Sequence, residues 1–270
     1  MAPMTICLVN QKGGCGKSSC CFHLSGAFAE RELRVLLIDA DPQGSLSQGF
    51  FGSTLVEHFE AHETVAALFH DESGFVTPAS LPVLTPFERV SIVTANQLLA
   101  PYNSPARESA GLNQYAFREL IDAIDGYDLV LVDCPPNIYL CSWNALLASD
   151  FVLIPVPPED FGTQGLRVVH ESIQSATRLN PRLRLLGHLV SRYDKRLLLH
   201  RAYEQKLRSL YGDALLSAVL PEASAFKVAI ACRQPVNHYS PRSTAAGFVR
   251  LLADEILTRT TRVNVEQAVA

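Results

Sequence analysis

The sequence predicts a doubly wound α/β fold, in which a single, mostly parallel β-sheet carries helices on both faces. Several short runs of leucine and β-branched residues lack polar alternation, as in strands that are covered on both faces. Helical patterns separate these runs, as in a parallel sheet built from strand–helix–strand units. A glycine-rich loop joins the first apolar run to the first helical pattern. No linker or repeat interrupts the chain, so we expect one domain over residues 1–270, with a flexible tail from about residue 260.

The individual elements follow from the same patterns, with prolines ending several of the apolar runs. We expect buried strands at residues 5–10, 34–40, 127–136, 150–158, 184–191 and 214–221. We expect helices at residues 17–31, 111–125, 141–148, 162–178, 196–211 and 241–258. The segment 50–110 is rich in proline, serine and threonine, and its pattern predicts no regular element.

Composition excludes several classes of protein. The chain has 270 residues, of which 48% are hydrophobic, which is enough for a substantial core. No apolar run reaches the roughly 18 residues that a membrane-spanning helix needs. The first ten residues, MAPMTICLVN, lack the basic and apolar regions of a signal peptide. We therefore expect a cytoplasmic protein with no membrane partner.

The cysteines do not form a metal-binding pattern. No C-x-x-C pair occurs, and clustered thiolates at ligand spacing are what iron–sulfur and zinc sites require. Scattered cysteines in a cytosolic chain are typical of reduced, mostly buried thiols. The seven are Cys7, Cys15, Cys20, Cys21, Cys134, Cys141 and Cys232.

Charge is distributed unevenly along the chain. The formal net charge is −4, yet residues 1–177 carry 8 basic against 20 acidic residues. Residues 178–260 reverse this balance, with 14 basic and 6 acidic residues. A basic C-terminal third on an acidic protein is consistent with binding to a polyanion. The alternative, arginines that are merely solvated on helix surfaces, fits the charge pattern equally well.

The loop QKGGCGKS at residues 11–18 has the chemistry of a phosphate loop. Its glycines let backbone N–H groups converge on an anion, and the following helix N-terminus adds partial positive charge. Lys17 would then reach the β- and γ-phosphates of a nucleotide, and the Ser18 hydroxyl would ligate Mg²⁺. A glycine turn with an incidental lysine is the alternative, and the flanking strand and helix argue against it.

A second lysine, Lys12, precedes the glycines, and Gln11 stands where a phosphate loop usually has glycine. Two ammonium groups this close repel each other unless an anion lies between them. The string KGGCGKSS resembles the KGG-x-GK-[ST]-[ST] loop of the ParA/MinD class of P-loop ATPases. The resemblance implies ATP as the nucleotide and a catalytic Lys12 that crosses a dimer interface to the partner's nucleotide, as an arginine finger does. It also implies nucleotide contacts from Gly13, Gly14, Cys15, Gly16, Lys17, Ser18 and Ser19.

Two further strings resemble the switch motifs of that class. VLLIDADPQGSLSQGF at 35–50 resembles switch I, which implies that Asp41 positions or activates the attacking water. YDLVLVDCPPN at 127–137 resembles the Walker B strand and switch II, which implies a role in Mg²⁺ binding for Asp133. The catalytic residues implied are Lys12, Lys17 and Asp41, and the metal site combines Ser18, Asp41 and Asp133. Asp39 also ends the switch I strand, and its contribution to the metal shell stays open.

The similarity continues through the C-terminal half. PVPPEDFGTQGL at 155–166 resembles a family segment in which a glutamate, here Glu159, follows a strand. The stretch 190–212 resembles the Tyr-Asp-x-Arg-Thr motif and the helix after it, with Leu197 in place of the threonine. The stretch 219–236 resembles the loop that frames the adenine, which implies a nucleotide contact from Pro221. This loop departs from the family's Pro-Arg-Asn, because Glu222 and Ala223 follow the proline.

Differences within the class indicate its short, ParA-like branch. The chain ends LTRTTRVNVEQAVA, without the basic, apolar amphipathic helix by which a MinD-like protein binds membranes. We do not expect an N-terminal DNA-reading helix-turn-helix, because the phosphate loop begins about residue 10. The branch implies an ATP-dependent homodimer, non-specific DNA binding, nucleoid association and a cargo-side activator similar to ParB. Candidate DNA-binding residues are Lys195, Arg196, Arg201, Arg208, Arg233 and Arg242.

Three functions are compatible with these motifs. The first is a partition or positioning ATPase that distributes a plasmid, a chromosomal locus or a protein cargo over the nucleoid. The second is a metabolic P-loop ligase or kinase of related fold, similar to dethiobiotin synthetase, with rapid turnover that needs no DNA. The third is a nucleotide-gated binding module that hydrolyses little.

Overall fold

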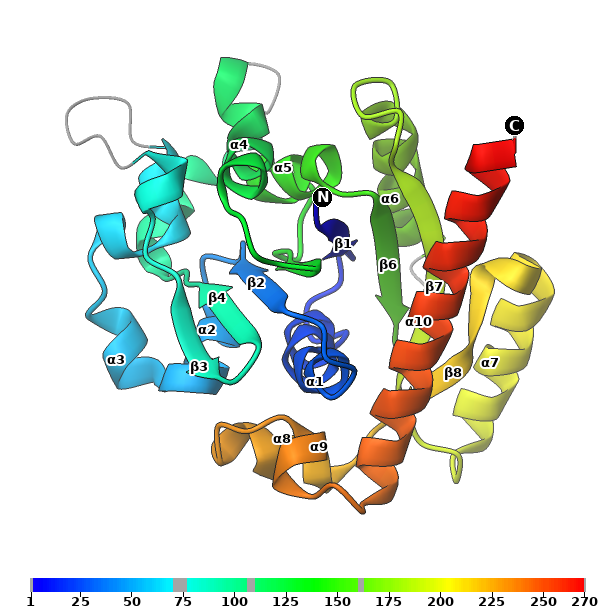
Figure 1. Cartoon of the computed structure of the whole chain (residues 1–270). Coiled ribbons are helices and arrows are strands. Elements are labelled where there is room, and N and C mark those ends of the chain that lie inside the picture. Colours follow the sequence, from blue (N-terminus) through cyan, green and yellow to red (C-terminus); the bar gives the residue numbers. More distant parts are fainter. Residues whose placement is uncertain (1, 70–76, 106–109, 160–162, 270) are drawn as a thin grey trace.

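The computed structural model describes residues 2–69, 77–105, 110–159 and 163–269. Its strands form a single sheet in the order β3-β4-β2-β5-β1-β6-β7-β8 (Figure 1). Every pair of neighbours is parallel except β3 and β4, which are antiparallel. The fold class predicted from the sequence is therefore confirmed. The strands are β1 (Met4–Leu8), β2 (Val35–Asp39), β3 (Leu84–Phe87), β4 (Val90–Val93), β5 (Leu129–Asp133), β6 (Phe151–Val156), β7 (Arg184–Tyr193) and β8 (Leu215–Pro221).

Helices cover both faces of this sheet (Figure 1). One core contains side chains of α4, α5 and α6, and the other contains side chains of α1, α2, α8, α9 and α10. The bounds are α1 (Lys17–Ala29), α2 (Ser45–Phe51), α3 (Ser53–Glu57), α4 (Ala116–Ala123), α5 (Leu140–Ala148), α6 (Thr163–Ala176), α7 (Leu198–Tyr211), α8 (Ser224–Ala231), α9 (Val236–Tyr239) and α10 (Thr244–Val269). Across the described ranges, no helix combines the length and the apolar character needed to cross a bilayer.

The two cores arise from the alternation of side chains along each strand. On β2, Leu36 and Ile38 point into the core under α4 and α5, whereas Val35 and Leu37 point into the core under α1. All five residues of β2 are buried. This two-sided burial explains why the strand sequence shows no polar alternation.

The segment 50–110 contains two strands that the sequence pattern does not reveal. Strand β4 is only four residues long, VSIV, although all four are buried. Strand β3 contains Pro86 and lies at the edge of the sheet, where a missing N–H donor is tolerated. Both strands are too short and too irregular in composition for a periodicity argument. Helix α8 lies within the stretch 219–236, which was expected to be a loop, and no element was expected over most of α9. Both helices are short.

The sheet brings together the carboxyl ends of the central strands. Strands β1, β2 and β5 are parallel and adjacent, and Asp39 of β2 is in register with Asp133 of β5. The loop between β1 and α1 leaves the same edge of the sheet. Ligands of open α/β sheets bind at this edge, outside the carboxyl ends of the strands.

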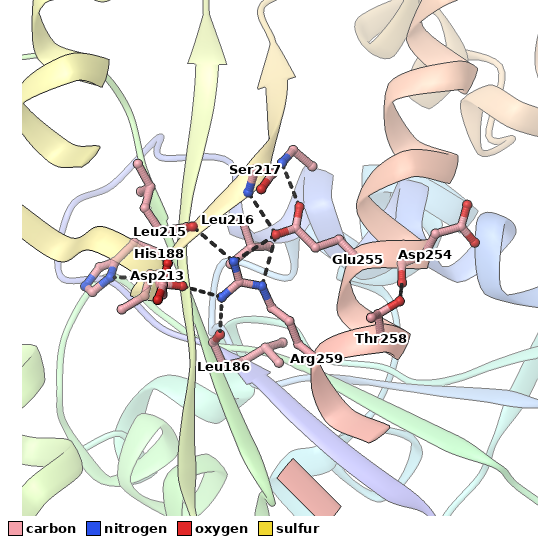
Figure 2. A network of polar contacts seen from close by, with 12 residues as sticks. Leu186, His188, Asp213, Leu215, Leu216, Ser217, Asp254, Glu255, Thr258 and Arg259 are labelled. Atoms are coloured by element: carbon pink, nitrogen blue, oxygen red, sulfur yellow. Dashed lines mark hydrogen bonds and ion pairs between the residues drawn. The ribbon is translucent and has the colours of Figure 1, made fainter. Parts of the chain in front are cut away.

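Strand β8 is the last strand of the sheet, and two side chains of α10 cover its free side (Figure 2). The Glu255 carboxylate accepts hydrogen bonds from the N–H groups of Ser217 and Ala218, at 2.8 and 2.7 Å. Arg259 donates to backbone carbonyls, and it is held by an ion pair with Glu255 at 2.9 Å. The acceptors are the carbonyls of Leu186, Asp213 and Leu215. These contacts satisfy backbone groups where the pairing of β7 with β8 shifts register.

Replacing Glu255 by alanine should therefore destabilise the fold. The N–H groups of the exposed Ser217 and the half-buried Ala218 would lose a charged acceptor, and Arg259 would lose its partner. We expect the free energy of unfolding to fall by about 2 kcal/mol, measured by urea denaturation. Glu171→Ala is the matched control, because its i,i+4 pair with Arg167 is exposed. The control should cost at most about 0.5 kcal/mol. Equal losses in the two variants would contradict the capping role of Glu255.

Candidate functional site

The loop between β1 and α1 presents an array of unpaired N–H donors. Gly14 and Gly16 have φ angles of 70° and 92°, in the left-handed region that glycine adopts without strain. Gly16 is the N-cap of α1. Among the described residues, the N–H groups of Gly13, Gly14, Cys15 and Gly16 have no hydrogen-bond acceptor. Consecutive free donors at a helix N-terminus form an anion-binding nest.

Lys17 lies within this loop. Its ammonium donates to the carbonyls of Asn10 and Lys12, at 3.2 and 3.4 Å, and its side chain is buried. Both acceptors are neutral, so the positive charge of Lys17 has no ion-pair partner among the described residues. A phosphate in the nest would lie next to an uncompensated cation.

Lys12 is directed elsewhere. Its ammonium forms an ion pair with Glu159 at 2.7 Å, and both side chains are about half exposed. The Lys12 ammonium lowers the pKa of the Glu159 carboxyl. Asn10 fixes the start of the loop, because its side chain accepts from the Lys12 N–H and donates to the Pro155 carbonyl. The repulsion expected between Lys12 and Lys17 is thus relieved within one chain by Glu159.

Two carboxylates are buried beneath the loop. Neither oxygen of Asp133 has a hydrogen-bond partner of ordinary geometry among the described residues. Burial raises the pKa of Asp133 to about 7, while the nearby Ser18 hydroxyl and Lys17 ammonium oppose that shift. The opposing Asp39 accepts from the Ser47 hydroxyl and N–H, at 2.7 and 2.9 Å. Burial, and then the charge of Asp133, raise the pKa of Asp39 well above its usual range.

Asp41 stands at the start of a tight turn after β2. One oxygen accepts from the Gln43 N–H at 2.9 Å, and the Asp41 side chain is largely buried. Burial raises the pKa of Asp41, and Lys17 is close enough to act in the opposite direction. Gly44 must be glycine here, because its φ is 61° and a Cβ would lie 2.5 Å from the Ala95 carbonyl oxygen.

A pocket of about 340 Å³ joins the loop to the segment after β8. Ser18 and Ser19 line one end, and Pro221 and Phe226 line the other. Of the loop residues predicted to bind nucleotide, the six from Gly14 to Ser19 share this cavity with Pro221, whereas Gly13 does not line it. Glu222, at the departure from the family pattern, forms ion pairs with Arg192 and Lys227 at 2.9 and 2.7 Å.

The residues of this site fit a magnesium-bound nucleotide. Within the described ranges, no three His, Cys, Asp or Glu side chains are grouped to hold a metal by themselves. Mg²⁺ does not need such a group, because it keeps several waters and binds one or two protein oxygens plus substrate phosphates. The buried, unpartnered carboxylate of Asp133 beside Ser18 suits that role.

The candidate DNA-binding residues fall on two parts of the chain. Lys195, Arg196, Arg201 and Arg208 lie on α7 or in the turn before it. Two of them already have acidic partners, since Arg196 pairs with Asp194 and Arg208 with Glu204, each at 2.7 Å. Arg233 follows α8, and Arg242 follows α9. DNA binding by these residues stays a prediction.

The sequence analysis missed several residues that shape the site. Asn10 and Ser47 orient the loop and Asp39, and Ser191 and Arg192 contact the loop carbonyls. Their signals are weak, because a serine or arginine beyond a strand end has many possible roles. Only Asn10, directly before the loop, could have been suspected from its position.

The buried state of Asp133 makes stability depend on pH. Its pKa is about 7 in the folded protein and near 3.8 when unfolded, so the native state binds more protons between these values. This contribution to stability falls as pH rises through that window. Without nucleotide and Mg²⁺, Asp133→Asn should be more stable than the wild type at pH 8, by on the order of 2 kcal/mol.

Urea denaturation at pH 8 and pH 4 measures this difference. The advantage of Asp133→Asn should become small at pH 4, where the carboxyl is protonated in the native wild type and partly protonated in its unfolded chain. An asparagine variant that is less stable than the wild type at pH 8 would contradict the assignment.

Known proteins resemble this chain over most of its length. A family model described as an AAA domain matches residues 4–185. The chromosome-partitioning ATPase Soj of Thermus thermophilus is 35% identical over 259 residues, covering 94% of this chain and 95% of Soj. The chromosome partitioning protein ParA of Caulobacter vibrioides is 31% identical over 259 residues, covering 94% of each chain.

A solved structure with bound ligands has a similar fold. Cobyrinic acid a,c-diamide synthase of Mycobacterium smegmatis, with a bound ATP analogue and magnesium, superposes with a TM-score of 0.78. The two are 25% identical, and the match covers 96% of each chain. The loop with two lysines, the carboxylates beneath it and the near-full-length similarity to Soj and ParA all agree, and this chain belongs to the ParA/MinD class of P-loop ATPases.

Proposed function

We propose that the protein is a partition or positioning ATPase that binds Mg²⁺-ATP, dimerises around two nucleotides, binds DNA without sequence preference and releases it on hydrolysis. A cargo-side activator protein would stimulate that hydrolysis. The cargo would be a plasmid, a chromosomal locus or a protein assembly, and the protein would work in the cytoplasm on the nucleoid. The relatives Soj and ParA, both named for chromosome partitioning, support this proposal.

The observation that carries the proposal is that the ammonium groups of the two lysines lie in different places and have different partners. Lys17 is buried within its own loop, whereas Lys12 reaches an exposed ion pair at the loop entrance. An exposed ion pair contributes little free energy, so it can be exchanged at small cost. A partner's nucleotide phosphate, with more negative charge than one carboxylate, would attract Lys12 away from Glu159. Hydrolysis would then depend on dimerisation.

The remaining groups would act within one subunit. The free N–H groups of the loop and Lys17 would hold the phosphates, and Ser18 and Asp133 would hold Mg²⁺. Mg²⁺ would supply charge neutralisation of the phosphates. Asp41, close to Lys17 and largely buried, would orient the attacking water.

The α7 region supports the DNA-binding part of the proposal. Within the described residues, Lys195 and Arg201 form no ion pair, so they are available to phosphates. Several individually weak phosphate contacts give binding that falls steeply with salt, which suits transient association with a nucleoid.

A metabolic ligase is the second candidate, because the cobyrinic acid a,c-diamide synthase shares the fold at 25% identity. Such an enzyme would turn over a small substrate rapidly without DNA. ATPase assays with and without DNA separate these two functions, since only the positioning ATPase should be slow alone and stimulated by DNA with an activator.

DNA binding should require ATP. We expect the wild type to bind non-specific duplex DNA with ATP and Mg²⁺, but not with ADP or without nucleotide, measured by fluorescence anisotropy at two salt concentrations. Raising the salt from 50 to 200 mM should weaken binding by about tenfold or more. Arg201→Ala should weaken binding and reduce the salt dependence, whereas Arg34→Ala, at the opposite end of the strands, should not. No binding in any nucleotide state would refute the nucleoid function.

Hydrolysis should depend on Lys12 and Asp41 for different reasons. Asp41→Ala should lower the ATPase rate at least tenfold and retain the ATP-dependent dimer, because water activation is lost while Ser18 and Asp133 still hold Mg²⁺. Lys12→Ala should lose both hydrolysis and the dimer, because the charge that crosses the interface is gone. Phosphate release and light scattering measure the two properties. A Lys12→Ala variant that still forms an ATP-dependent dimer would argue against the role of Lys12 in trans.

A further inference from the structure

Two side chains at the end of β7 contact the carbonyl oxygens of the phosphate loop. The buried Ser191 hydroxyl donates to the Cys15 carbonyl at 2.7 Å. The Arg192 guanidinium donates from Nη1 to the Gly14 carbonyl at 3.0 Å. Both bonds join residues that are more than 170 positions apart in the sequence.

These two bonds set the direction of the neighbouring N–H groups. In a trans peptide unit, the carbonyl and the following N–H point in opposite directions. Carbonyls of Gly14 and Cys15 that are turned toward β7 therefore aim the N–H groups of Cys15 and Gly16 the other way. Both of these N–H groups are without an acceptor among the described residues, and both residues line the nucleotide pocket.

The Arg192 side chain is itself held in place. Its Nε donates to one oxygen of Glu222 at 2.9 Å, and the other oxygen of Glu222 pairs with Lys227 at 2.7 Å. Arg192 also has a φ of 55°, which is uncommon for a residue other than glycine. Such a backbone conformation persists only where the surroundings impose it, and it is frequent at functional sites.

We propose that Ser191 and Arg192 are positioning residues that hold the phosphate loop in its anion-binding conformation, and that Glu222 aims Arg192 at the loop. Glu222, at the departure from the family's adenine-framing motif, thereby acts on the phosphate end of the ligand. This inference rests on the proposed binding of nucleotide. The ligand class is any compound with a pyrophosphate group, whatever its base.

Binding of fluorescent ATP and ADP analogues, and their competition by inorganic pyrophosphate, tests the proposal. Arg192→Gly is the main variant, because glycine adopts a φ of 55° without strain and the fold should therefore be retained. We expect the Kd for ATP, ADP and pyrophosphate to rise together by about tenfold, as for one lost charged hydrogen bond. Ser191→Ala should act in the same direction. Arg167→Ala, which removes a surface arginine paired with glutamate, is the matched control and should leave every Kd unchanged.

Two further readouts separate positioning from other roles. Thermal unfolding without ligand should show Arg192→Gly to be as stable as the control, so a general loss of structure does not account for weaker binding. In steady-state ATPase assays, KM should rise while kcat changes little, because ground state and transition state lose the same contact.

Glu222→Ala distinguishes positioning from direct contact. If Arg192 and Lys227 bound the ligand themselves, freeing them from Glu222 would tighten binding. Positioning predicts the reverse, a Kd for pyrophosphate about threefold higher than in the wild type. Tighter binding by Glu222→Ala, or a Kd of Arg192→Gly equal to that of the control, would overturn the inference. A wild type that binds none of these ligands would instead refute the proposed nucleotide site.

Discussion

Two buried carboxylates that face each other across neighbouring strands are the constraint on which this site depends. Asp39 and Asp133 are in register on β2 and β5, and neither is exposed. Placing two acidic groups side by side in a low-dielectric environment is unfavourable. Burial raises both pKa values, and the charge of Asp133 raises the pKa of Asp39 further. Such an arrangement persists where a cation or a functional requirement compensates. The loop with its free N–H groups lies at the same edge, so anion and cation sites adjoin.

The contacts of the phosphate loop keep its two positive charges, Lys12 and Lys17, apart in the absence of a ligand. Among the described residues, the Lys17 ammonium contacts carbonyl groups and forms no ion pair, and Lys12 is drawn outward by Glu159. Asn10, directly before the loop, and Ser191 at the end of β7 hold the loop at two points. A ligand thus meets donors that are already oriented, which avoids part of the ordering cost of binding.

Much of this architecture could be predicted from the sequence, because buried parallel strands and a glycine loop leave strong local signals. The register of Asp39 with Asp133 could not, since it depends on which strands become neighbours. For the same reason, the contacts of Ser191 and Arg192 with the loop could not be predicted, because they form only when β7 lies beside β6. Strand β4 was missed because four residues are too few to show a period. The ion pair of Lys12 with Glu159 joins residues that are 147 positions apart, so no local sequence pattern indicates it.

Helix α7 differs from every other long helix in how loosely it is attached. Of its fourteen residues, all of them described, Leu207 alone is buried. Detaching such a helix exposes little apolar surface, so local opening costs much less than global unfolding. Its amide hydrogens should exchange with solvent early, well before those of β5, whose five residues are all buried. A ligand that binds to α7 would therefore slow that exchange. Hydrogen exchange of this helix would thus report binding at its surface.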